Sequence, residues 1–205
     1  MLSAILILIC ILTFALAADG TVGRFFVVAL QGLTLTVILR SSEAKPRTVR
    51  IAATLTLLSL IAVLLTASIG GKLAEAGPGI IGALLALVGP IVIARRLFRQ
   101  DAINFRTVAG AVCIYLLAGM FFALVFWTMG AIQSKGFFAQ TYPGSPTDFV
   151  YYSFITLTTV GYGDLTAAHD IGRLSSVLEA LFGQLYLVSV VALLVSNVGH
   201  VRRPQ

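Results

Sequence analysis

The part of this sequence best suited to chemistry is the run TTVGYG followed by an aspartate, residues 158–164. Gly161 and Gly163 allow positive φ angles that other residues avoid, so successive backbone carbonyl oxygens can point toward one axis. Such a strip of neutral dipoles can replace the hydration shell of a monovalent cation without a fixed negative charge in the ion's path. The expected ion ligands are the carbonyl oxygens of Thr159, Val160, Gly161 and Tyr162, with the Thr159 hydroxyl below them and Gly163 completing the strip.

A short helix is expected to lead into this strip. Ser145 is a suitable N-cap, Pro146 suits the first helical position, and Asp148 lies near the positive end of the helix dipole. The helix should end at about Leu157. Its carbonyl end would then carry about half a negative charge and favour a cation in a central cavity.

The composition excludes a water-soluble globule. Of the 205 residues, 59% are hydrophobic and 11% are charged, whereas soluble domains average about 45–50% apolar and 25% charged residues. We therefore expect a membrane domain with little else. Cys10 and Cys113 lie in apolar runs, which gives no support to a disulfide framework or a zinc site. The net charge of +6 comes without a basic, aromatic patch, so nucleic acid is not an expected partner.

Uncharged runs predict where the chain crosses the membrane. They predict six spans, at residues 1–18, 25–39, 51–71, 76–94, 107–134 and 174–199. Most basic residues lie between spans two and three, between spans four and five, and after span six, so the positive-inside rule places these segments and both termini in the cytoplasm, with the chain in the cell membrane. For residues 1–17, a cleaved signal peptide is the alternative interpretation.

Residues 158–164 resemble the selectivity-filter signature of the potassium-channel family. The likeness extends over about residues 107–199, because a pore helix, the filter and an inner helix follow in the family's order. It implies an all-α membrane protein with six transmembrane helices, in which a re-entrant pore helix and filter lie between helices five and six. It also implies a homotetrameric pore, because each chain carries one filter loop.

The expected organisation has four parts. Residues 1–98 would form a four-helix transmembrane bundle of unknown role, 99–106 a cytoplasmic linker, 107–199 the pore domain and 200–205 a short cytoplasmic tail. The implied function is passive, potassium-selective flux among membrane lipids, with no cofactor besides the potassium ions in the filter. A weakly voltage-gated or less selective cation channel is an alternative, and so is the membrane subunit of a potassium transporter.

Residues beside the filter take supporting roles through the resemblance. Thr158 and Asp164 flank the filter. Tyr151 and Tyr152 stand where the family commonly has a Trp pair, so they can form an aromatic cuff with a hydroxyl bonded to Asp164. Packing alone would explain the two tyrosines equally well. Ala167 replaces a proline that often ends the outer filter turn, which predicts a looser outer mouth.

The inner helix offers candidates for gating. Gly183 stands where the family often has a hinge glycine, and close helix packing is the alternative reason for a glycine there. A three-to-four spacing places further candidates on one face, which would line the cavity and an apolar gate: Gln184, Leu187 or Val188, Val191 and Val195. An ordinary packing stripe has the same spacing.

Glu179 is an ionisable residue placed well inside a predicted span, where a carboxylate is costly enough to suggest a function. Helical geometry turns it away from the cavity face that contains Gln184. We expect a structural role behind the filter, with Ser153 or Thr156 as hydrogen-bond partners. Proton sensing is the alternative.

The first four spans lack the pattern of a voltage sensor. Arg95, Arg96 and Arg99 cluster at the cytoplasmic end of span four and do not repeat at every third position inside it, so strong voltage gating is not expected. An enzyme is not expected either. His169 and His200 fall on opposite predicted sides, and no buried Asp pair or Ser/His set is apparent.

Overall fold

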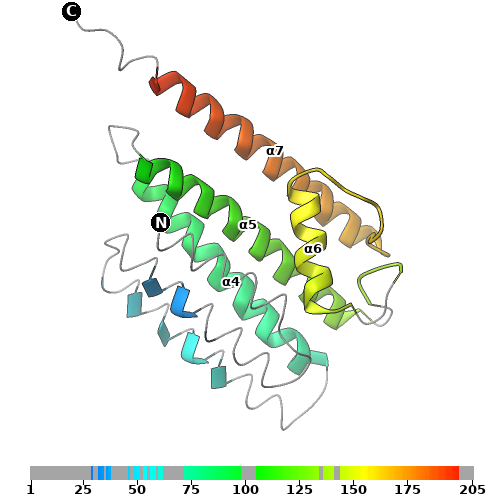
Figure 1. The fold of residues 1–205 in the computed structure, drawn as a ribbon. Coiled ribbons are helices and arrows are strands. Elements are labelled where there is room, and N and C mark those ends of the chain that lie inside the picture. The colour runs from blue at the N-terminus through cyan, green and yellow to red at the C-terminus, as the bar shows by residue number, and fades with distance from the viewer. Residues whose placement is uncertain are drawn as a thin grey trace, which may run out of the picture.

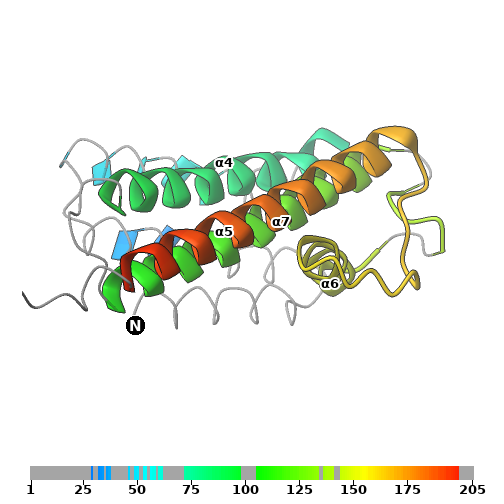
Figure 2. The ribbon, with the colours of Figure 1, turned by 90° about the horizontal axis from the view of Figure 1, so that it is seen from above.

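The structure is a computed structural model, and its described part is helical. Four helices are assigned: α4 (Lys72–Leu97), α5 (Phe105–Ile132), α6 (Pro146–Leu157) and α7 (Asp170–Val198). The described residues are 29, 32–34, 36–37, 46, 49–50, 53–54, 56–58, 60–61, 72–97, 105–133, 136–140 and 144–198. Figure 1 shows α4, α5 and α7 as long rods, with the short α6 near the end of the rods where α7 begins. In Figure 2, α6 is seen along its axis beside α5 and α7, both of which it contacts.

Three of these helices, α4, α5 and α7, cover the last three predicted spans with shifted ends. α4 is longer than the predicted 76–94, and α7 begins at Asp170, before the predicted 174. Within the described residues, Thr107–Ile132 is long and apolar enough to cross a bilayer, and Gly79–Arg95 is a shorter apolar helical stretch.

Several predictions fall on the rest of the chain. Residues 1–18, with the signal-peptide alternative, and residues 200–205 lie outside the described residues. The described positions within 25–39 and 51–71 are helical. Six membrane spans and the four-part organisation therefore stay predictions.

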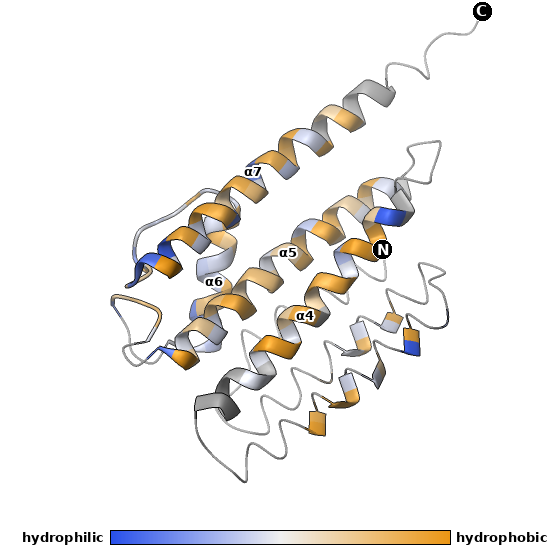
Figure 3. Ribbon diagram, turned by 180° about the vertical axis from the view of Figure 1, so that it is seen from behind, coloured by the Kyte–Doolittle hydropathy of each residue, from blue (hydrophilic) through white to orange (hydrophobic). Residues whose placement is uncertain are grey.

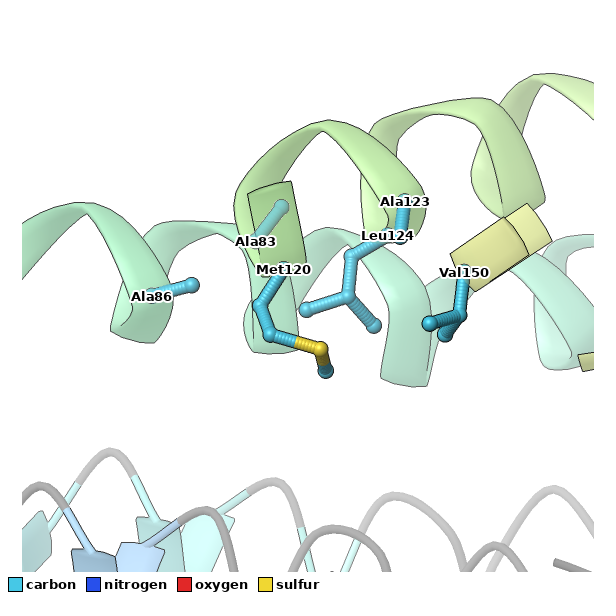
Figure 4. Close-up of a cluster of buried hydrophobic side chains, with 6 residues drawn as sticks. All are labelled: Ala83, Ala86, Met120, Ala123, Leu124 and Val150. Carbon is cyan, nitrogen blue, oxygen red and sulfur yellow. The ribbon is translucent and has the colours of Figure 1, made fainter. Parts of the chain in front are cut away.

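α4 and α5 pack side by side through small residues. Figure 4 shows this core, which α6 completes with one valine: Ala83, Ala86, Met120, Ala123, Leu124 and Val150. A Cβ atom on Gly79 would overlap the Thr128 hydroxyl, which itself donates to the Leu124 carbonyl oxygen at 2.7 Å. Small side chains at such contacts let two helix backbones approach closely in a membrane protein. α4 is therefore closely fitted to α5.

α6 begins with the predicted cap. The amide of Asp148 donates to Ser145 Oγ at 3.2 Å, and the amide of Ser145 donates to Asp148 Oδ2 at 2.8 Å. This reciprocal pair satisfies two amide groups that a helix start would otherwise leave without partners. Pro146 lies in the first turn, where its missing N–H is no loss. The predicted start and the predicted end at Leu157 are both confirmed.

An aromatic cluster holds α6 between α5 and the segments on either side of the filter. Its buried members are Phe126, Phe137, Phe138, Phe149, Tyr152 and Ala167. The rings of Phe126 and Phe137 have centroids 4.9 Å apart, and Phe126 meets Tyr152 edge to face at 5.3 Å. Such pairs contribute about 0.5–1.5 kcal/mol each beyond the burial of their area. The cluster thus fixes the position of α6.

α7 approaches α6 most closely at Gly183. A Cβ atom built on Gly183 would overlap the carbonyl oxygen of Leu157, the last residue of α6. Nearby, Tyr186 of α7 stacks on Tyr115 of α5 with ring centroids 5.9 Å apart, and the Tyr186 hydroxyl donates to the Ala111 carbonyl oxygen at 2.7 Å. Close packing is therefore a sufficient reason for the glycine, and the hinge role stays a prediction.

Replacing Gly183 with alanine should force α7 away from α6. The new methyl group would meet backbone atoms that cannot rotate aside, so we expect the free energy of unfolding to fall by about 1–3 kcal/mol, seen as a lower melting temperature of the purified protein. Gly77→Ala is the matched control, because a Cβ atom on Gly77 meets nothing within 4 Å and alanine favours a helix. An unchanged melting temperature for Gly183→Ala would contradict the close contact.

Candidate functional site

The filter segment, residues 158–164, leaves α6 in a turn that directs its first amide groups back into the helix. The amides of Val160 and Gly161 both donate to the Ile155 carbonyl oxygen, at 2.9 and 3.1 Å. Within the part of the chain that the structure describes, the carbonyl oxygens of residues 159–163 accept no hydrogen bond. The whole segment is exposed. These carbonyl groups are therefore available to a ligand.

Positive φ angles shape this strip. Gly161 has φ +49° and Gly163 has φ +82°, as predicted from their residue type. A Cβ atom at either glycine would meet nothing within 4 Å, so the backbone angle and not crowding favours glycine at both positions. Thr159 also has a positive φ of 59°, which the sequence did not indicate. A β-branched residue rarely adopts this conformation, so the backbone is strained at Thr159.

The two tyrosines of α6 bind different partners. Tyr151 donates its hydroxyl to Asp164 Oδ2 at 2.7 Å, the contact predicted for the aromatic pair. The Tyr152 hydroxyl lies 2.7 Å from Ser176 Oγ in α7. Tyr151 thus ties the outer end of the filter to its own helix, whereas Tyr152 ties that helix to α7.

Gln140, in the loop before α6, clamps the segment after the filter. Its Oε1 accepts from the Thr166 amide at 2.9 Å, and its Nε2 donates to Thr166 Oγ1 at 2.8 Å. Backbone bonds reinforce the clamp, because Ala139 N donates to the Thr166 carbonyl oxygen at 2.9 Å. Sequence reasoning missed Gln140, since no local pattern relates it to a residue 26 positions later.

Ala167 directly follows Thr166, the residue that Gln140 binds. It forms an isolated antiparallel bridge with Phe138, and the amide of Ala168 donates to the Phe137 carbonyl oxygen at 2.9 Å. The Ala167 side chain is buried against the aromatic cluster. The sequence predicted a looser outer mouth at Ala167. In the structure, backbone pairing and packing hold this residue in place.

The base of the filter is held by a side chain of α5 and by the first side chain of the filter segment itself. The Tyr115 hydroxyl of α5 donates to the Leu157 carbonyl oxygen at 3.2 Å, which braces the C-terminus of α6. The Thr158 hydroxyl donates to the Phe154 carbonyl oxygen at 2.6 Å. Thr158, predicted as a filter support, therefore directs its hydroxyl to α6.

The gating candidates lie along α7. Gln184 and Leu187 are exposed on this helix, whereas their neighbour Gly183 is buried against α6. The side chains of Val191 and Val195 lie outside the described residues. Cavity lining and an apolar gate stay predictions for this helix.

Glu179 is buried where α7 contacts α6. Its Oε1 forms a hydrogen bond with the Ser153 hydroxyl of α6, the first of the two predicted partners. Its relative exposure is 0%, and its predicted orientation away from a cavity stays a prediction.

Two comparisons with known proteins bear on this site. Residues 110–199 match the protein family described as "Ion channel". Over 111 residues the chain is 35% identical to a protein of Oryza sativa subsp. japonica named "Two pore potassium channel a". The similar region covers 54% of this chain and 28% of that relative, so the chain matches little more than a quarter of the relative's length. The strip of free carbonyls, the short helix behind it and both similarities agree, and residues 110–199 of this chain are similar to potassium channels of the ion-channel family.

Proposed function

We propose that four copies of this chain form a potassium-selective channel through which potassium ions cross the cell membrane passively. The observation that supports it is the set of exposed carbonyl oxygens at residues 159–163, which have no hydrogen-bond partner among the described residues. In lipid, each carbonyl group without a hydrogen-bond partner would raise the free energy of the protein by several kcal/mol. A dehydrated cation supplies the missing partner, because it accepts carbonyl oxygens in place of water.

The character of the ligands favours a monovalent cation. Residues 158–163 contain no charged side chain, so the ion would meet several layers of neutral dipoles that bind it without trapping it. α6 ends at Leu157, directly before the strip. Its carbonyl end adds about half a negative charge at the entrance to the filter, and four such ends around one axis would favour a cation there.

Assembly of four chains follows from the exposure of the same residues. One chain supplies one strip, and an ion needs oxygen ligands on all sides. Val160 and Tyr162 are 52% and 73% exposed. α7 also contains many hydrophobic residues, which colour much of its ribbon orange in Figure 3. Those that are more than half exposed are Ile171, Leu174, Val177, Leu178, Leu181, Leu185 and Val188. We assign this face and the filter to contacts between copies, with lipid around the outside.

α4 is assigned a supporting role without strong voltage sensing. The charged residues in its sequence are Lys72, Glu75, Arg95 and Arg96, all near its ends. A charge moved through 100 mV gains only about 2.3 kcal/mol, so a sensor needs several charges within the span. α4 instead presents small residues to α5. It serves the pore as a scaffold, in a chain whose termini both lie in the cytoplasm.

Ion selectivity tests the proposed filter directly. In planar bilayers with potassium on one side and sodium on the other, the wild-type current should reverse near the potassium equilibrium potential. Gly163→Ala should move the reversal toward zero, because alanine at φ +82° is strained by about 1–3 kcal/mol, and Gly77→Ala serves as the control. A wild-type reversal near zero would instead indicate a non-selective channel, and uptake without current would indicate a transporter subunit.

The assembly can be tested by native mass spectrometry in detergent. The wild-type protein should have the mass of four 21.7 kDa chains. Replacing Leu181 and Leu185 of α7 with alanine should shift the distribution toward smaller species, because each loses apolar contact worth about 2 kcal/mol. The matched control replaces Leu84 and Leu87, which are exposed on α4. Equal behaviour of the two double variants would contradict the assignment of the α7 face.

Tyr151→Phe should shorten the open times of single channels. It removes the hydroxyl that holds Asp164 at the outer end of the filter, a hydrogen bond worth about 1 kcal/mol, or roughly fivefold in the open-state population. Tyr152→Phe makes the same chemical change one residue further on, where the partner is Ser176. It should lower thermal stability and leave open times within the wild-type range. Equal open times in both variants and the wild type would exclude a role for the Tyr151 contact in the filter.

A further inference from the structure

Three buried polar groups form a chain of hydrogen bonds from α7 through α6 to α5. Glu179 Oε1 contacts the hydroxyl of Ser153, and that hydroxyl also lies 2.7 Å from the Gly119 carbonyl oxygen. Both side chains have a relative exposure of 0%. Figure 2 shows α6 beside α5 and α7, both of which it contacts. Water therefore does not reach the contacts in this subunit.

The number of available hydrogens determines the protonation state of Glu179. A serine hydroxyl has a single hydrogen, and a backbone carbonyl can only accept. Both contacts can be hydrogen bonds only if the hydrogen of Ser153 goes to the Gly119 carbonyl oxygen and Glu179 supplies the hydrogen of the other contact. If Glu179 were ionised, one of the two contacts of Ser153 Oγ would bring two oxygen atoms together without a hydrogen between them. A neutral carboxylic acid donates its own O–H to Ser153 Oγ, so both contacts become hydrogen bonds.

The surroundings of the second carboxyl oxygen of Glu179 also fit a neutral acid. Glu179 Oε2 is buried and has no hydrogen-bond partner among the described residues. A bare oxygen of a carboxylate would carry unpaired charge, whereas the carbonyl oxygen of a neutral acid carries none and costs far less to bury. One neutral acid thus accounts for both oxygens.

The neighbouring ionisable groups offer no positive charge to compensate a carboxylate. Tyr115 of α5 donates its hydroxyl to the Leu157 carbonyl oxygen and carries no positive charge. Asp148 lies at the start of α6. On α7, Arg173 is exposed and lies 3.7 Å from Asp170. No salt bridge to Glu179 is formed within the described residues.

The chain of hydrogen bonds lies one helical turn from the base of the filter. Ser153 is four residues before Leu157 on α6, and Glu179 is four residues before Gly183 on α7. Residues four apart lie on the same face of a helix. The Glu179–Ser153 contact and the close approach of Gly183 to Leu157 therefore belong to one helix interface, which ends where the filter begins.

We propose that Glu179 is a neutral carboxylic acid that positions the filter, because its donated hydrogen bond to Ser153 holds α7 and α6 together against α5. Glu179 does not contact the ion, and its effect passes through Ser153 to the C-terminus of α6. This role rests on the proposed potassium filter, whereas the protonation state rests on the hydrogen count alone.

Infrared spectroscopy of the full chain in lipid tests the protonation state without any current. The wild type should show the C=O stretching band of a neutral carboxylic acid, and Glu179→Gln should lose it. Asp170→Asn is the matched control, because Asp170 is exposed and its removal should reduce only the carboxylate bands. A wild-type spectrum without the acid band, or an acid band that persists in Glu179→Gln, would overturn the assignment.

Potassium current and selectivity test the positioning role. Glu179→Gln keeps a donor toward Ser153 and no charge, so its current should stay within about twofold of the wild type. Glu179→Met and Ser153→Ala each break the chain of hydrogen bonds and should lower the current or the selectivity by roughly tenfold. The proposal fails if Glu179→Met and Ser153→Ala conduct as the wild type does, or if Glu179→Gln is as impaired as Glu179→Met.

The protonation state of Glu179 and the proposed potassium filter can be tested separately. A wild-type protein that shows the acid band but passes no potassium current would refute the potassium filter and the positioning role, and leave the neutral acid in place. If Glu179→Met does not fold, Ser153→Ala still tests the positioning role, because it leaves the acid itself intact and removes only its acceptor.

Discussion

The filter segment has five successive backbone carbonyl groups, at residues 159–163, without a hydrogen-bond partner among the described residues. Lipid offers no hydrogen bonds, so such a strip is stable only where it faces water, ions or other protein. The other features of residues 110–199 follow from that constraint. α6 uses its own carbonyl groups to hold the first amides of the strip, and the glycine angles keep the next carbonyls free.

The strip is held at its two ends. At the outer end, Tyr151 binds Asp164, and Gln140 binds the residue two positions further along the chain. At the inner end, Tyr115 braces the last carbonyl group of α6. This arrangement keeps the two ends of the strip in register with the helices. A short segment under backbone strain at Thr159 needs such support on both sides.

Close helix contacts supply that support, and small or polar residues make them possible. Gly183 lets α7 reach the C-terminus of α6, and Gly79 lets α4 reach Thr128 of α5. In a membrane the hydrophobic effect does not press helices together, so close packing and buried hydrogen bonds carry the specificity. The contact between Glu179 and Ser153 is of this kind. It also explains why a costly acidic residue lies inside an apolar helix.

The amino-acid sequence by itself determined the features that depend on near neighbours and residue type. The cap at Ser145, the end of α6 at Leu157, the positive φ angles of Gly161 and Gly163 and the burial of Glu179 were all predictable, because caps, backbone angles and helix faces are set within a few residues.

Only the tertiary structure decided which distant residues meet. In the structure Glu179 forms its hydrogen bond with Ser153 and not with Thr156. Tyr152 contacts Ser176, and Gln140 contacts Thr166. These contacts join residues far apart in the chain, and their geometry depends on how α5, α6 and α7 pack against one another. Local sequence patterns do not specify how helices pack. The sequence therefore indicated which groups can form hydrogen bonds, whereas the tertiary structure determined which of them meet.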